Sequence, residues 1–134
     1  MSKRDPKVTL KQVADQARWA QELCTRNTLA ELLTDWQKRA AFERVMEVMG
    51  EAVKRLPPEL TARYPAVDWR GIAGMRDRVS HGYDAIDYGL LWQAVETRVP
   101  GLLSTVEQML KDLEDEVAAE QEGESAGTRT REKV

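Results

Sequence analysis

The sequence predicts an all-α fold, an up-and-down bundle of about five helices followed by a disordered acidic tail. Apolar residues recur every three or four positions through most of the chain, which is the spacing of a buried helical face. No stretch alternates apolar and polar residues between hairpin turns, so no sheet is predicted. The length of 134 residues and the hydrophobic content of 42% suit one globular domain, which we expect to span residues 1–119.

The first half of the chain is predicted to form three helices. After Pro6, an apolar face runs from Leu10 to Leu23. The segment Thr28-Leu-Ala-Glu31 has the spacing of a capping box and is expected to open a short helix. Asp35 can cap a long helix, and Pro57-Pro58 stops it.

The second half is predicted to hold a helix of one or two turns and three longer ones. The short helix starts at Pro58, and the next runs from its cap at Asp68 through Val79 to a stop at Gly82. Asp87 caps the following helix, and a last helix, over 102–117, comes after a break at Pro100.

Residues 120–134 differ from the rest in composition. They have almost no apolar side chains to bury, which predicts a disordered tail. Residues 111–134 hold eight acidic and four basic side chains, a net charge of −4, so the rest of the chain carries +1. The overall charge of −3 argues against a strong non-specific nucleic-acid binder, but the basic excess over residues 54–81 permits a local phosphate-binding surface.

The cysteine and histidine counts limit the disulfides and metal sites that the chain can form. Cys24 is the only cysteine, which excludes an internal disulfide framework and a multi-cysteine metal site. His81 is the only histidine, which excludes a multi-histidine metal centre within one copy. No cofactor is expected. The start of the chain lacks the apolar core of a signal peptide, and no apolar run approaches a membrane span. We therefore expect a soluble, cytoplasmic protein.

The segment from Ile72 to Asp84 carries the candidate functional residues. On an ideal helix, Arg76 lies ~40° from Ile72 and ~60° from Val79, at the edge of the apolar stripe. An arginine there needs a carboxylate, a phosphate or a partner surface, because an unpaired buried charge is costly. Arg76 is therefore the first candidate for binding phosphate.

His81 and Tyr83 follow near the end of the same predicted helix. His81 lies ~140° around the helix from Arg76, so the two converge only if the helix unwinds at Gly82 or if a second copy supplies one of them. Arg78 is ~60° from His81 and is its neighbour on one face. The position of Tyr83 after the helix stop would place its hydroxyl near the imidazole.

Each of these residues also has an interpretation without a function. A lone histidine at a helix end is commonly a partner of the helix dipole or a half-buried filler. Arg76 could pair with Glu47 or Glu51 on the long helix, and Tyr83 could be an aromatic at the edge of the core. Core or interface packing, rather than base stacking, is expected for the four tryptophans, which are Trp19, Trp36, Trp69 and Trp92.

Arg76-x-x-x-x-His81-x-Tyr83 resembles the signature of the HepT-like branch of the HEPN superfamily, ribonuclease toxins of bacterial and archaeal toxin–antitoxin pairs. The segment Glu47-Val-Met-Gly-Glu51-Ala is similar to a helix motif of that family, and Tyr64-Pro-x-x-x-Trp69-x-x-Ile72-Ala-x-Met75-Arg76 resembles its approach to the catalytic arginine. The resemblance covers residues 4–113 and includes three more matches, which are Arg4-Asp5-Pro6, Asp87 and Trp92.

Two positions depart from the family pattern. Asp77 stands where asparagine is common, and it puts a negative charge beside the expected phosphate site, which would lower or retune activity. Val45 follows Arg44 where asparagine is also common, and this removes a polar side chain from the long helix. Neither change touches Arg76, His81 or Tyr83.

The resemblance implies a metal-independent endoribonuclease. RNA can be cut by its own 2′-hydroxyl attacking the adjacent phosphate, so the protein need supply neither nucleophile nor metal. His81 would act as general base or acid, and Arg76 would stabilise the charge that builds on the phosphorus. Asp77, Arg78 and Ser80 are candidates for supporting or substrate-binding roles. Separate acid and base would need two histidines and hence a homodimer, which the resemblance also implies.

The resemblance further implies a protein partner, a cognate minimal nucleotidyltransferase of the MntA type. Such an antitoxin transfers AMP from ATP to the tyrosine of the motif, here Tyr83, and the added phosphate would occupy Arg76 and exclude RNA. Two other classes of function stay open. One is a non-catalytic HEPN module that binds nucleotide or RNA or holds the nucleotidyltransferase, and the other is a purely structural bundle.

Overall fold

The computed structural model describes residues 5–80 and 86–132, and every regular element within these two ranges is a helix. This confirms the predicted all-α fold. The four longer helices are α1 (Pro6–Arg26), α3 (Trp36–Lys54), α7 (Tyr88–Thr97) and α8 (Val99–Glu132). The four shorter ones are α2 (Leu29–Thr34), α4 (Pro58–Thr61), α5 (Trp69–Ala73) and α6 (Met75–Ser80).

Most helices begin where the sequence supplies a capping residue. The side chains of Thr28, Asp35 and Asp87 accept hydrogen bonds from amides two or three positions further on, at 3.1, 2.9 and 3.1 Å. Each bond satisfies an amide of the first turn that has no partner within its helix. Pro100 also separates two helices as predicted, although it lies in the first turn of α8, where a missing amide hydrogen is harmless.

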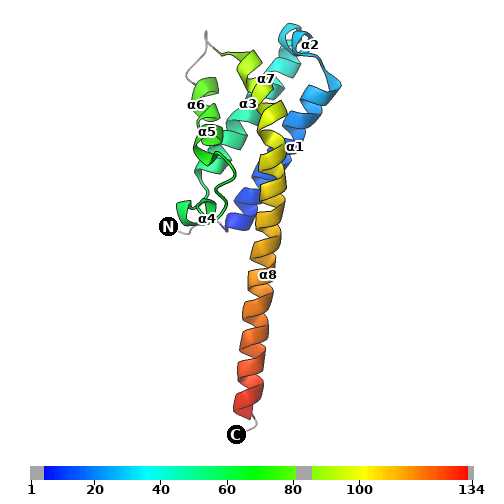
Figure 1. The fold of residues 1–134 in the computed structure, drawn as a ribbon. Helices are drawn as coiled ribbons and strands as arrows, with labels where there is room; N and C mark the ends of the chain where they lie inside the picture. The colour runs from blue at the N-terminus through cyan, green and yellow to red at the C-terminus, as the bar shows by residue number, and fades with distance from the viewer. Residues whose placement is uncertain (1–4, 81–85, 133–134) are drawn as a thin grey trace.

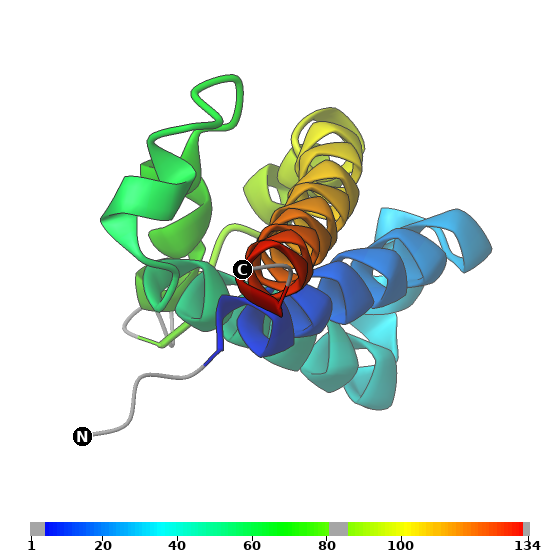
Figure 2. The same cartoon turned by 90° about the horizontal axis from the view of Figure 1, so that it is seen from below.

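Helix α1 packs against both α3 and α8, and α7 packs against α1, α2 and α8 (Figure 1). In the same view α1 runs up, α3 down, α5 and α6 up and α8 down, which is the predicted up-and-down order. Seen along α8, the short helices α4 and α5 lie on one side, and α1 and α2 lie on the other (Figure 2). The largest fully buried side chains of the core include Leu10, Leu32, Phe42, Met46, Met49, Ile72, Leu102 and Met109.

The prediction of one continuous helix from Asp68 through Val79 is wrong. The structure divides it into α5 and α6, and Gly74 stands in a turn between them. Glycine has a low helix propensity, so an interruption is favoured at this position. The division raises the number of helices within the described residues to eight, against the seven predicted along the sequence, five of them long and two short.

Helix α8 extends well beyond the bundle (Figure 1). Its docked part ends where the hydroxyl of Tyr64 donates to Asp112 at 2.6 Å and Arg63 pairs with Glu116 at 2.6 Å. The side chains of residues 114–123 are all exposed. The chain is nevertheless helical to Glu132, where the sequence predicts disorder from residue 120. A helix already formed by its docked half can propagate through the alanine, glutamate and glutamine of residues 118–122 without burial. Residues 123–132 include two glycines and two threonines, and their helix propensity does not explain the rest of the extension.

No helix in the part of the chain that the structure describes is both long enough and apolar enough to cross a membrane.

Candidate functional site

The candidate site is built on the turn between α5 and α6. Asp68 caps α5 by accepting a hydrogen bond from the amide of Gly71 at 3.0 Å. Ile72 and Met75 then anchor the two helices in the core, with exposed fractions of only 1% and 3%. Because Met75 is buried, the adjacent Arg76 is held at the edge of the core, as the sequence predicts.

Gly50 on α3 lets the site approach the core helix closely. A Cβ atom at this position would lie 2.8 Å from the backbone nitrogen of Arg76 and 3.0 Å from the carbonyl oxygen of Ile72. Side chains do not tolerate such distances from backbone atoms, so only glycine permits this packing. The backbone of Arg76 is therefore seated directly on α3, and Gly50 is a positioning residue that the sequence does not single out by itself.

The side chain of Arg76 is half-buried, and its Nε atom has no hydrogen-bond partner among the described residues. The two carboxylates that the sequence suggests as ion-pair partners are paired elsewhere. Glu47 lies 3.7 Å from Arg44, and Glu51 lies 3.4 Å from Arg55. An arginine in this position retains its capacity to bind an anion.

The other predicted site residues are placed only in part. Asp77 lies on α6 next to Arg76 and is exposed. Arg78 and Ser80 belong to the same helix. His81 and Tyr83 lie outside the described residues, so the expected convergence of arginine, histidine and tyrosine stays a prediction.

The two described tyrosines both use their hydroxyl groups within the fold. Tyr64 donates to Asp112 at 2.6 Å, and burial together with this hydrogen bond raises the pKa of Tyr64. Tyr88 donates to Glu43, and burial together with that hydrogen bond raises the pKa of Tyr88 to about 12. Both phenols therefore stay protonated and engaged at neutral pH.

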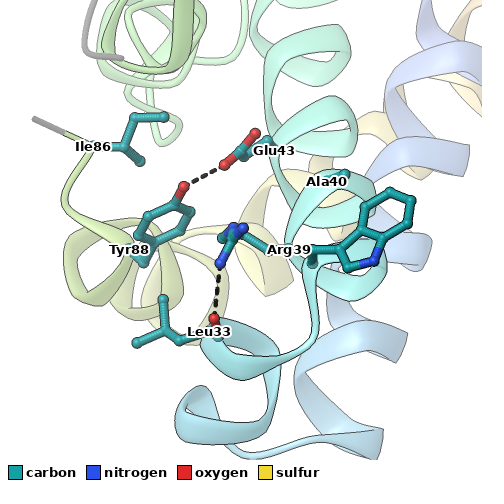
Figure 3. A pocket seen from close by; sticks show the side chains of 7 residues that line it. Leu33, Arg39, Ala40, Glu43, Ile86 and Tyr88 are labelled. Atoms are coloured by element: carbon teal, nitrogen blue, oxygen red, sulfur yellow. Dashed lines mark hydrogen bonds between the residues drawn. The ribbon is translucent and has the colours of Figure 1, made fainter. Parts of the chain in front are cut away.

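A pocket with a volume of about 430 Å³ lies beside the start of α7 (Figure 3). It is lined by residues of α2, α3 and the segment that enters α7, among them Leu33, Arg39, Glu43, Ile86 and Tyr88. Trp36 also lines it, with 67% of its surface exposed. Trp36 is therefore not part of this chain's own core, and its packing at an interface stays a prediction. Its place in the first turn of α3, directly after the cap Asp35, was the available signal of exposure.

The other three tryptophans also differ in how far they are buried. Trp69 and Trp92 are partly buried against the core, and the indole of Trp69 donates to the carbonyl of Tyr64 at 2.9 Å. Trp19 on α1 is 50% exposed. Among the described residues, histidine, cysteine, aspartate and glutamate side chains form no cluster of three that could hold a metal ion.

Proteins with sequences similar to this chain are described as ribonucleases. A family model described as "Ribonuclease HepT-like" matches residues 13–109. "Putative RNase MJ0127" from Methanocaldococcus jannaschii is 34% identical over 116 residues, which cover 87% of this chain and 96% of that protein. "Probable ribonuclease HepT" from Thermococcus cleftensis is 30% identical over 109 residues, which cover 81% and 99% of the two chains. No solved structure matches the chain.

Proposed function

Because this chain belongs to the HepT-like ribonuclease family, we propose that it is an endoribonuclease that cleaves RNA without a metal ion, at a site formed by Arg76 and His81. The observation that carries this proposal is the state of Arg76. Its backbone is seated on α3 through Gly50, and its buried Nε atom has no partner among the described residues. A scissile phosphate is an anion that would complete this arrangement.

The chemistry uses the substrate's own nucleophile. The 2′-hydroxyl attacks the adjacent phosphorus and loses its proton to the imidazole of His81, and the 5′-oxygen leaves with a proton from a general acid. The products are a 2′,3′-cyclic phosphate and a free 5′-hydroxyl. Imidazole suits this role because its ordinary pKa lies near neutrality. The guanidinium of Arg76 stabilises the developing charge, and Arg78 and Ser80 are proposed to help hold the strand.

We propose a homodimer because one chain has a single histidine. Two copies of His81 in one cleft would let one act as base while the other acts as acid. Light scattering at micromolar concentration should give twice the mass of the 15.2 kDa chain. A monomeric mass under conditions where the protein cleaves RNA would contradict this part of the proposal.

RNA cleavage in the presence of EDTA tests the activity. Arg76→Ala and His81→Ala are expected to lose about 10²-fold or more of the wild-type rate, the usual effect of removing one positioned group. Arg70→Ala is the matched control, since it removes an exposed cation of α5 six residues before Arg76. Circular dichroism should be unchanged in all three variants. Equal residual cleavage in every sample would identify a contaminant, and binding without cleavage would indicate a non-catalytic module.

We further propose that the protein is the toxin of a toxin–antitoxin pair and that a cognate minimal nucleotidyltransferase neutralises it by adding AMP to Tyr83. The state of the other tyrosines supports this choice. The side chains of Tyr64 and Tyr88 are partly buried against the core and their hydroxyl groups are held by carboxylates of other helices, which limits the access of a nucleotidyltransferase to them. A phosphate attached to Tyr83 would compete with RNA for Arg76.

Intact-mass measurement after incubation with ATP and the nucleotidyltransferase tests this regulation. The mass is expected to rise in steps of one AMP unit in the wild type, in Tyr64→Phe and in Tyr88→Phe, and to stay constant in Tyr83→Phe. Gains that persist in Tyr83→Phe would move the modification to another residue. No gain in any sample would leave neutralisation by complex formation as the better account.

A further inference from the structure

The pocket beside α7 has the chemical character of a site for a nucleobase. Its volume of about 430 Å³ falls within the roughly 300–1,000 Å³ that small-ligand sites occupy. Trp36 contributes a large aromatic surface that is 67% exposed, although tryptophan usually buries most of its area. A flat, accessible indole is the side chain on which nucleic-acid bases stack.

The pocket also has polar lining residues that are held in place by hydrogen bonds (Figure 3). Nη1 of Arg39 donates to the carbonyl of Leu33 at 2.9 Å, which fixes the guanidinium beside the cavity. The hydroxyl of Tyr88 donates to Glu43 on the same side. A cation suits a polyanionic strand, and a hydrogen-bonded carboxylate can accept from the edge of a base.

The pocket lies on the same face of α3 as the contact with Arg76. Glu43 and Gly50 are seven residues apart, which places them ~20° from one another around the helix and ~10.5 Å apart along it. Gly50 touches the backbone of Arg76, and α6 runs antiparallel alongside α3 toward the pocket (Figure 1). Trp36 lies fourteen residues before Gly50, ~21 Å along the helix, so a single RNA strand of several nucleotides would span the distance between Arg76 and Trp36.

We propose that this pocket binds one nucleobase of the RNA strand, stacked on Trp36, while the phosphate backbone of the strand lies at Arg76. The inference rests on the proposed ribonuclease function. It adds to the proposed catalytic site a base-binding subsite that is separate from the reacting groups. The pocket positions the strand, and Trp36 contributes to affinity rather than to the chemical step. An adenine carried by AMP on Tyr83 has the same stacking chemistry, so the experiment must separate the two sources.

The test measures binding of a short single-stranded 2′-O-methyl RNA, which has no 2′-hydroxyl and cannot be cleaved. The protein is produced without the nucleotidyltransferase, and its intact mass confirms that Tyr83 is unmodified. Trp36→Ala is expected to weaken binding about 5-fold or more, as loss of a stacked base does, and Trp36→Phe should recover most of it. Trp19→Ala is the matched control, since Trp19 is also exposed, at 50%, but does not line this pocket.

A series of oligonucleotides with one abasic position each locates the base. One position should weaken wild-type binding, and the same position should have no effect in Trp36→Ala, because the contact is then already lost. The proposal would be overturned if abasic substitution weakened the binding of Trp36→Ala equally at every position of the oligonucleotide. It would also be overturned if Trp36→Ala bound the intact RNA as tightly as the wild type. Tryptophan fluorescence separates the two sources, with Trp36→Ala identifying the part of the signal that comes from Trp36. If AMP modification changes the Trp36 signal but addition of RNA to unmodified protein does not, the pocket belongs to the regulatory nucleotide and the RNA assignment is wrong.

Light scattering of the same variants excludes a second copy of the chain as the occupant. Trp36→Ala should keep the wild-type oligomeric state, and conversion to a smaller species would show that this surface joins protomers and would overturn the proposal. The binding readout is independent of cleavage. If RNA is cleaved but Trp36 has no effect on binding, only this inference fails. If RNA binds through Trp36 but is not cleaved, only the proposed catalysis fails.

Discussion

At the scale of single residues, Gly50 links the core to the candidate site. A Cβ atom there would meet three backbone atoms of the α5–α6 turn within 3.2 Å, and backbone cannot move aside as a flexible side chain can. The position of Arg76 therefore depends on the lack of a Cβ atom at Gly50 of α3. Any substitution at Gly50 must push the two segments apart.

The variant Gly50→Ala tests this dependence. Alanine favours a helix by ~1 kcal/mol over glycine, but here the clash should outweigh that gain, so we expect a lower melting temperature and a lower rate of RNA cleavage. Gly101→Ala on α8 is the control, since a Cβ there has no neighbour within 4 Å and should leave both properties intact or raise stability. Thermal unfolding followed by circular dichroism distinguishes the two. A Gly50→Ala protein as stable and active as Gly101→Ala would show that the contact is easily relieved.

Cys24 gives a second prediction for a single residue. Burial, aided by the negative charge of Glu96, raises the pKa of the Cys24 thiol to about 12. The thiolate is the reactive form, so alkylation at pH 8 should run ~10³-fold slower than for an ordinary cysteine, and its rate should keep rising with pH as far as pH 12. Timed labelling with iodoacetamide, read by mass, measures this. The protein in guanidinium chloride serves as the control, and equally fast labelling of the folded protein would contradict the prediction.

At the scale of elements, α5 is too short to be stable alone and depends on its cap and its anchor. Asp68 serves twice, because one oxygen accepts from the amide of Gly71 at 3.0 Å and the other lies 3.3 Å from Arg98 at the start of α8. The same side chain thus begins the segment that carries Arg76 and ties it to the last helix.

Substitutions of Asp68 separate these two contributions. Asp68→Ala removes the cap and the ion pair and should cost about 1 kcal/mol of unfolding free energy, the usual value of a lost cap. Asp68→Asn keeps an oxygen that can cap and should cost less, since exposed ion pairs contribute little. Denaturant titration gives both values. Equal losses in the two variants would assign the stability to the pair with Arg98 instead.

At the scale of the whole molecule, only the first part of α8 belongs to the hydrophobic core. Buried side chains of α8 stop at Met109, and the last contacts with the bundle come from Asp112 and Glu116. We therefore propose that residues 1–119 are the folding unit, although the helix itself runs further. Residues 120–134 hold four acidic and three basic side chains, and these charges then act on solubility or on partners rather than on the fold.

Truncation after Ala119 tests this division. The shortened chain keeps every contact named above, so its melting temperature should stay within about 1–2 °C of the full-length value, a change well below 1 kcal/mol. RNA cleavage should also be retained. A loss of several degrees would show that the exposed half of α8 is stabilised by something outside the single chain, such as a second copy.

The fold class followed from the sequence because it depends on local rules. The three- and four-residue spacing of apolar side chains and the caps at Thr28, Asp35, Asp68 and Asp87 act within one or two turns, and the structure confirms them. The edge position of Arg76 was predictable for the same reason. Only the tertiary structure decided that Gly50 touches Arg76, that Glu47 and Glu51 pair elsewhere, and that Trp36 faces a pocket. Gly50 and Arg76 are distant along the chain, and side-chain periodicity carries no information about which helix face meets which. Glu47 and Glu51 pair with residues three and four positions away, and periodicity alone does not decide between such a local partner and Arg76.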